Sequence, residues 1–404
     1  MSQLVLKHPD LKHEDLKFNT VEVHAGEPRD MYGALIPPIY QTSTFYFDST
    51  DDAVKACDDY AESFAYSRIT NPSVDYLEQK LAALEHGKEA VAYASGMGAV
   101  SGAIFALLKS GDHAIFTKAK YSGTEDVTSD WLPRFGIAHD TFDAADLSQL
   151  EGLIKPNTKL IYVESPANPT MVLVDIAAVV EIAHKHGIKV FIDNTFATPY
   201  NTTPLDLGVD AVIHSLTKYI GGHSDVVGGA VVVNDEETRE KVAFLQNAAG
   251  AVPSPFDSWL DIRGLKTLDL RVKRHSANAL KVAEWLAQHP QVERVNHPAL
   301  PGSKGHEYWQ RDFTGSSGLF SFVLKKRLNN DELASYLDNF SLFSMAYSWG
   351  GFESLILANQ PEQIAALRPG GEVDFSGTLI RLHIGLENAD DLIADLAAGF
   401  ARIV

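Results

Sequence analysis

The sequence predicts an α/β protein with a large, mostly parallel sheet and a smaller C-terminal α+β domain. After Gly87, short apolar runs alternate with helical patterns. These runs are apolar on both faces, which is typical of strands covered by helices on both sides. The chain has 404 residues, more than one hydrophobic core usually organises. We therefore expect an N-terminal arm over residues 1–62, a large domain over 63–260 and a C-terminal domain over 261–404.

The expected elements follow one another along the chain. A short acidic helix begins after Ser49 or Thr50, and the next helix begins near Pro72, a residue favoured in a first helical turn, and ends at Gly87. Strands are expected at residues 90–94, 113–117, 159–164, 189–194, 211–215 and 229–233, and helices around 97–109, 124–135, 145–153, 176–186, 236–249 and 264–288. The rest of the chain is expected to contain a loop over 297–309, a helix over 329–339 and a last helix after Asn388. It also contains the apolar runs 318–326, 340–348, 354–359 and 378–386.

Composition excludes several classes of function. Lys and Arg number 34 against 53 Asp and Glu, a formal net charge of −19. Such a balance argues against nucleic-acid binding and against a polybasic membrane surface. Cys57 is the single cysteine, so no disulfide can form within the chain. The first residues lack the apolar core of a signal peptide, and no apolar run is long enough to cross a membrane, so we expect a cytoplasmic protein.

Three features lie at the carboxyl ends of predicted strands. AVAYA leads into SGMGAVSGAIFALL, a glycine-rich turn that opens a helix and offers free amides to a phosphate. The strand KVFIDN carries Asp193 at its end, and AVIHSLTKYIGGHSD places Ser215, Thr217 and Lys218 directly after another strand. Because a ligand site in a parallel sheet lies beyond the carboxyl ends of the strands, we expect these groups to meet there.

Together these residues are the set that pyridoxal phosphate needs. Gly96, Met97, Ser215 and Thr217 would form a phosphate cradle. Lys218 would form the Schiff base, and Asp193 would keep the ring nitrogen protonated, so that the ring can accept electrons from a carbanion at the substrate Cα. The sequence therefore predicts pyridoxal 5'-phosphate as the cofactor.

Other interpretations of the same turn stay open. Gly96, Gly98 and Gly102 nearly form the G-x-G-x-x-G of dinucleotide-binding proteins, but the last spacing is one residue too long. The following strand ends in Lys118 and Lys120 rather than in an acid, which leaves an NADP-linked oxidoreductase as an alternative. A non-catalytic binder with the same fold is a further alternative. No P-loop motif occurs, and no histidine pair has metal-ligand spacing with a third ligand, so no metal site is predicted.

Seven motifs in order resemble one enzyme family. YSRITNPS, SGMGA, YSGT, ESPANPT, DNTFATP, SLTKYIGGHSD and RLHIGLE are similar to motifs of the cysteine/methionine-metabolism family of pyridoxal-phosphate enzymes. The resemblance begins at about Phe18 and covers nearly the whole chain after it. It implies the aspartate-aminotransferase fold (fold type I), with residues 63–260 as the cofactor-binding domain. It also implies a homotetramer built from two tight dimers.

The resemblance implies roles for further residues. Tyr121 would stack on the cofactor ring and assist proton transfer to the leaving group. Tyr66 and Arg68, in YSR, would reach the phosphate of the neighbouring subunit, so that each site needs a dimer. Asn168 and Arg381 would contact the cofactor face and the α-carboxylate of a sulfur-containing amino-acid substrate, which suits a bidentate guanidinium.

The segment Tyr347-Ser348-Trp349 bears on which reaction is catalysed. These three residues would line the substrate pocket, and γ-acting members typically have Glu-Ser-Leu there. A bulky Trp349 narrows the pocket, which favours β-elimination over the longer γ-intermediate.

From about Leu265 the chain is similar to enterobacterial cystathionine β-lyases, whereas earlier motifs are closer to γ-lyase, γ-synthase and sulfhydrylase members, as in a mosaic. We expect a carbon–sulfur lyase of trans-sulfuration and methionine biosynthesis that converts cystathionine to homocysteine, pyruvate and ammonia. Methionine or cystathionine γ-lyase, O-acetylhomoserine sulfhydrylase and cystathionine γ-synthase are the alternatives.

Overall fold

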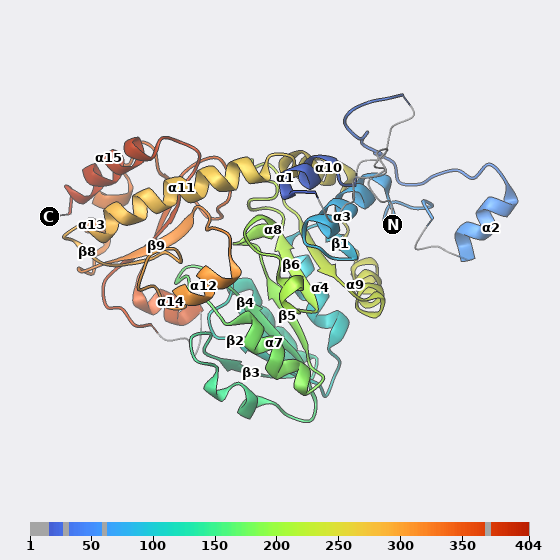
Figure 1. Ribbon diagram of the computed structural model, residues 1–404, viewed down its shortest axis with the longest axis horizontal. Helices are drawn as coiled ribbons and strands as arrows, with labels where there is room; N and C mark the ends of the chain where they lie inside the picture. Colours follow the sequence, from blue (N-terminus) through green and yellow to red (C-terminus); the bar gives the residue numbers. More distant parts are fainter. Residues whose placement is uncertain (1–15, 27–31, 59–62, 368–372, 404) are drawn as a thin grey trace.

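Two β-sheets organise the chain, and Figure 1 shows the smaller one on the left of the molecule and the larger one to its right. This computed structural model describes residues 16–26, 32–58, 63–367 and 373–403. The larger sheet has the strand order β1-β7-β6-β5-β4-β2-β3. Its strands are β1 (Glu89–Tyr93), β2 (His113–Thr117), β3 (Ala138–Phe142), β4 (Thr158–Glu164), β5 (Lys189–Asp193), β6 (Ala211–Ser215) and β7 (Gly229–Val233). Strand β7 is antiparallel to β1 and β6, and the other neighbours are parallel, as predicted.

Helices cover both faces of the larger sheet. Along β4, Leu160 and Tyr162 belong to one apolar cluster, and Ile161 and Val163 belong to another. Because successive side chains of a strand point to opposite faces, each cluster lies on its own face. The first cluster includes residues of α4 (Gly96–Leu107) and α9 (Glu236–Ala249), and the second includes α3 (Pro72–Leu84) and α7 (Ile176–Lys185). This double cover explains the nearly continuous apolar runs of the strands.

The smaller sheet carries the C-terminal part of the chain. Its order is β10-β11-β12-β9-β8, with antiparallel pairs except between β10 and β11. Its strands are β8 (Val292–Asn296), β9 (Leu319–Leu324), β10 (Ser344–Met345), β11 (Leu355–Asn359) and β12 (Leu379–His383). The helices around it are α11 (Leu268–Ala287), α12 (His306–Asp312), α13 (Asn330–Leu337), α14 (Pro361–Leu367) and α15 (Ala389–Phe400), which Asn388 caps as predicted.

Helix α11 joins the two sheets. At its start, Leu268 and Val272 belong to the core of the larger sheet, and towards its end Val282 and Leu286 belong to the core of the smaller sheet. Figure 1 shows this long helix running between the two halves of the molecule. The helix predicted over 264–288 corresponds to α11, whereas α10 (Pro255–Leu265), which precedes it and is capped by Ser254, was not predicted. Ser254 accepts a hydrogen bond from the Asp257 N–H at 3.0 Å.

Some expected loops contain regular structure, and some expected helices are irregular. The predicted arm contains α1 (Phe18–His24) as well as the expected α2 (Thr50–Asp58), and α12 lies in the expected loop 297–309. Strands β3 and β8 were not predicted, because β3 is a half-exposed edge strand and β8 has charged residues at its centre. The expected helix over 124–135 is α5 (Ser122–Asp126), a π-helical turn and α6 (Leu132–Arg134), and residues 147–153 form 3₁₀ turns. A short α8 spans Thr198–Asn201.

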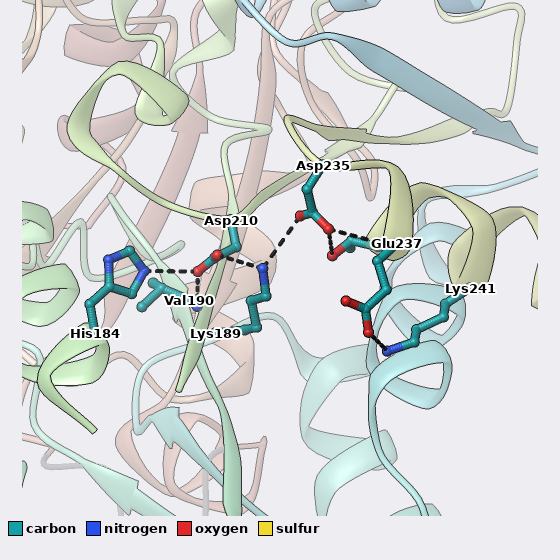
Figure 2. A network of polar contacts seen from close by, with 8 residues as sticks. His184, Lys189, Val190, Asp210, Asp235, Glu237 and Lys241 are labelled. Carbon is teal, nitrogen blue, oxygen red and sulfur yellow. Dashed lines mark hydrogen bonds and ion pairs between the residues drawn. The ribbon is translucent and has the colours of Figure 1, made fainter. Parts of the chain in front are cut away.

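A polar network holds the amino-terminal ends of β5 and β6 (Figure 2). Asp210 accepts hydrogen bonds from the Val190 N–H at 2.8 Å and contacts His184 Nε2 at 3.1 Å. Lys189 Nζ lies 3.0 Å from Asp210 and 3.4 Å from Asp235, the capping residue of α9. This network joins β5, β6, α7 and α9 at the edge opposite to the predicted ligand site.

No described helix combines the length and apolar character needed to cross a bilayer. Among the described residues no three His, Cys, Asp or Glu side chains are placed to hold a metal ion. Residues 1–15 lie outside the described residues, so the expected lack of a signal peptide stays a prediction.

Candidate active site

The ends of three strands meet at one edge of the larger sheet. Strand β5 ends at Asp193, and β6 ends at Ser215, two and three residues before Thr217 and Lys218. Strand β1 leads to Ser95, whose hydroxyl accepts a hydrogen bond from the Gly98 N–H at 3.0 Å and caps α4. The strands run in the same direction, so their carboxyl ends open on a common space.

That space is a cavity of about 420 Å³, which the C-terminal part of the chain closes from the other side. Most of the predicted site residues line it: Gly96, Met97, Tyr121, Asn168, Asp193, Ser215, Thr217, Lys218, Tyr347, Ser348, Trp349 and Arg381. Sequence reasoning did not single out several other lining residues, among them Glu164, Phe196, Leu357, Asn359 and Ile364.

Lys218 forms part of the cavity wall. Its Nζ donates a hydrogen bond to Ser348 Oγ at 2.7 Å and lies 5.6 Å from the ring centroid of Trp349. Burial first, and then the positive charge of Arg381, lowers the pKa of Lys218 to about 8, whereas the charge of Asp193 acts in the opposite direction. A lysine in this environment is neutral in a much larger fraction near physiological pH than an exposed lysine, and the neutral amine is the form that attacks a carbonyl.

Asp193 is a carboxylate inside the same cavity. Burial raises the pKa of Asp193, while hydrogen bonds from Thr195 and the charges of His214 and Lys218 lower it. Its Oδ1 accepts the Thr195 N–H at 3.0 Å. A buried carboxylate is stable as an anion when a cation faces it, and a protonated pyridine nitrogen is a cation of suitable size. The residue therefore fits the ring nitrogen of pyridoxal phosphate.

The amino end of α4 fits a phosphate. Gly96 comes so close to β6 that a Cβ there would lie 2.7 Å from the Cβ and Oγ of Ser215. The glycine therefore lets the start of α4 approach the Ser215 hydroxyl closely, and Thr217 lines the same cavity. Backbone N–H groups of a helix start, together with hydroxyls, are the usual donors to a phosphate. Thr217 Oγ1 is itself held by Gly228, whose N–H it accepts at 3.2 Å.

Arg381 and Asn168 approach the cavity from different elements. Arg381, on β12, donates from Nη2 to the Ser348 carbonyl at 3.1 Å, and burial lowers its pKa. Asn168 has a buried Oδ1 without a hydrogen-bond partner among the described residues. A polar ligand would give the buried Asn168 acceptor a hydrogen-bond partner and would give the partly desolvated guanidinium of Arg381 an acceptor.

Glu164 connects two of the predicted residues and was missed. Its carboxylate accepts the backbone N–H of Tyr121 and, at 3.3 Å, that of Asn168. It therefore orients the loops that follow β2 and β4. The signal was present in the sequence, because KLIYVE closes on an acid in the same way as KVFID.

Tyr66 and Arg68 do not line the cavity of their own chain. Arg68 donates to the Asn247 carbonyl at 2.8 Å, and its guanidinium carbon lies 5.9 Å from the Tyr66 ring centroid. Tyr66 is 43% exposed. Their predicted contact with a neighbouring subunit stays a prediction.

Comparisons with known proteins agree with this geometry. Residues 19–401 match the family described as Cys/Met metabolism PLP-dependent enzyme. The chain is 49% identical to cystathionine beta-lyase MetC of Escherichia coli, over 96% of this chain and 100% of the relative. It is 41% identical to an L-methionine gamma-lyase of Fusobacterium nucleatum subsp. polymorphum, over 95% and 98%, and 43% identical to a cystathionine gamma-synthase of Mycobacterium tuberculosis, over 93% and 95%. The crystal structure of metB from Corynebacterium glutamicum superimposes with a TM-score of 0.90 at 36% identity, covering 98% of this chain and 100% of that one.

Proposed function

Because the chain belongs to the Cys/Met metabolism PLP-dependent enzymes, we propose that it is a cystathionine β-lyase that forms homocysteine, pyruvate and ammonia from cystathionine and water. Family membership confirms pyridoxal phosphate as the cofactor and fold type I as the fold. The relatives are pyridoxal-phosphate-dependent lyases and synthases, which supports the prediction of a carbon–sulfur lyase. It leaves the NADP-linked alternative without support. The mixed resemblance of the sequence agrees with relatives named as β-lyase, γ-lyase and γ-synthase.

The observation that carries the choice of β-elimination is the position of Trp349. Its ring lies 5.4 Å from the ring of Tyr219 and packs on the core of the larger sheet. The indole is therefore held as a wall beside Lys218 Nζ. A fixed wall at this place shortens the space for the distal part of a substrate. The relative with 49% identity, named a β-lyase, supports the same choice.

The residues of the cavity would divide the work as follows. Pyridoxal phosphate, when bound, supplies an electron sink for negative charge at the substrate Cα. Gly96, Met97, Ser215 and Thr217 would hold the phosphate. Asp193 would hold the proton on the ring nitrogen.

The remaining residues would act on the substrate. Lys218 Nζ would bind the cofactor aldehyde and then move the proton of the substrate Cα, with Ser348 Oγ orienting it. Tyr121 would stack on the ring and deliver a proton to the leaving sulfur. Arg381 would bind the α-carboxylate through its two parallel N–H groups, and Asn168 would contact the cofactor face.

A second copy of the chain would complete each site. The part of the arm that carries α2 extends away from the body (Figure 1), and the side chains of Tyr32, Leu35 and Tyr46 are 87%, 93% and 87% exposed. An exposed apolar surface of this kind favours burial against another protein surface. We expect contacts made by the arm to place Tyr66 and Arg68, which follow it in the sequence, at the phosphate of a partner subunit in a homotetramer of two tight dimers. The cytoplasmic location stays a prediction as well.

A product assay tests the proposed function. Purified enzyme with cystathionine should release pyruvate, whereas 2-oxobutyrate would identify γ-cleavage. Lys218→Ala should abolish turnover. The control Lys159→Ala changes an exposed lysine at the amino end of β4, away from the cavity, and should leave turnover unchanged. Cystathionine synthesis from cysteine and an activated homoserine ester, without pyruvate release, would instead favour a γ-synthase.

A further inference from the structure

A second cavity of about 440 Å³ lies beside the candidate active site. Its floor follows the carboxyl ends of β2, β3 and β4, from which Lys118, Asp143 and Met171 line it. Its roof comes from β8 and the loop after β8, with Arg294 and Leu300. The edge of a sheet where the strands end is the usual place for a ligand in this class of fold. Nothing in the proposed lyase reaction uses this space.

The charged groups of the second cavity favour an anion. Lys118, Arg294 and Lys304 line it together with Asp143 and Asp374, which leaves one net positive charge. Arg294 and Lys304 share one carboxylate, that of Asp374. The ammonium group of Lys118 has no hydrogen bond or ion pair within the described part of the chain. One net positive charge in the lining suits a ligand with one negative charge.

Two buried donors in the same lining lack an acceptor. His297 is fully buried, and its Nδ1 accepts the Ala299 N–H at 3.2 Å, so the ring proton is on Nε2. His297 Nε2 and Arg294 Nε have no hydrogen-bond partner among the described residues. A buried donor without an acceptor destabilises a fold, and such groups in native proteins usually serve a ligand, an ion or a water. Burial lowers the pKa of His297 to about 4, so the ring stays a neutral donor at pH 7.

Apolar side chains form the rest of the lining. They include Met171, Val172, Leu300 and Ile364. Ile364 of α14 also lines the cavity that contains Lys218, so the two cavities share a wall. A ligand that filled the second cavity would therefore need a charged end and a short aliphatic body.

We propose that this second cavity is a binding site for a small aliphatic monocarboxylate, separate from the site of the lyase reaction. The carboxylate meets Lys118, Arg294 and the Nε2–H of His297, and the aliphatic body packs on Met171 and Leu300. Because the lining comes from both sheets, the bound ligand joins the C-terminal part of the chain to the larger sheet.

Calorimetric titration of the holoenzyme with isocaproate (4-methylpentanoate) tests this proposal. A ligand of this size should bind with a Kd on the order of 1 mM. Lys118→Met should weaken binding roughly tenfold to a hundredfold, the range for losing a hydrogen bond to a charged group. The control Lys159→Met removes the same charge from the exposed amino end of β4 and should change nothing. Arg294→Gln should weaken binding in the same direction as Lys118→Met.

Several results would overturn the proposal. Absence of heat at about ten times the expected Kd would mean that the cavity holds water alone. Equal affinity in wild type and Lys118→Met would remove the charge argument. Tighter binding of inorganic phosphate than of isocaproate would contradict a monoanion site. Trp349→Leu alters the other cavity and should leave isocaproate binding unchanged, so a weakening there would place the ligand beside Lys218 instead.

Discussion

The charges around Lys218 should set the pH at which the apoenzyme takes up pyridoxal phosphate. With a pKa of about 8, about one Lys218 in ten is neutral at pH 7, roughly 300 times the fraction for a lysine of pKa 10.5. Arg381 and Lys218 both donate hydrogen bonds to Ser348, to its carbonyl at 3.1 Å and its Oγ at 2.7 Å. The two cations are therefore within about 9 Å, where an effective dielectric constant of about 20 gives roughly 1.8 kcal/mol of repulsion. Arg381→Met should thus raise the pKa of Lys218 by about one unit and slow uptake at pH 7 about tenfold.

Stopped-flow measurement of uptake against pH checks this reasoning. The logarithm of the rate should rise with pH and level off near the pKa of Lys218. In Arg381→Met the break should move to higher pH, and in Asp193→Asn, which removes an anion, it should move to lower pH. Arg134→Met, an exposed arginine paired with Asp130, is the control and should leave the break in place. Movement of both site variants in one direction, or of neither, would refute the electrostatic account.

Further variants test other parts of the structure. Trp349→Leu should raise the share of 2-oxobutyrate among the products from cystathionine, and an unchanged ratio would remove the argument for selectivity. Glu85→Ala leaves His214 buried without its carboxylate partner and should lower the free energy of unfolding by about 3–5 kcal/mol, as measured by urea denaturation. The control Glu237→Ala, which breaks an exposed ion pair, should change the free energy of unfolding little. Burial lowers the pKa of His383 to about 3, whereas the pKa of a histidine in the unfolded chain is about 6.5. Below about pH 6.5 the unfolded chain therefore binds the proton more readily, and stability is lost as the pH falls towards 3. His383→Asn should flatten this decline in melting temperature between pH 7 and 4.5, and a parallel decline in both proteins would contradict it.

The strands of the larger sheet and the residues at their ends could be predicted because their signals are local. An apolar run that stops at Asp193 or Ser215 is visible in the sequence, and parallel topology brings such ends to one edge. The same logic applied to β4 would have found Glu164. The edge strand β3 was missed because it is exposed on one side and lacks the apolar run on which the prediction depended.

The C-terminal side of the site could not be derived from local patterns. Lys218 and Ser348 are 130 positions apart in the sequence, and no periodicity shows that they bond. Arg381 and Trp349 were identified through the family resemblance alone. The second cavity was not predicted, because it forms where the loops after β2 to β4 meet β8 and α14. Such a space depends on how the two sheets pack.

The reactivity of Lys218 is a joint property of the two sheets. Strand β6 of the larger sheet positions the lysine, but three residues of the C-terminal part determine its environment. Ser348 accepts its hydrogen bond, Trp349 covers it, and the charge of Arg381 lowers its pKa. Lys218 in the larger sheet alone would lose most of its burial, and its pKa would return towards 10.5. Packing of the C-terminal part is therefore needed to activate the lysine as well as to bind the substrate. A change at the sheet–sheet contact should for this reason alter cofactor uptake even when it lies outside the cavity.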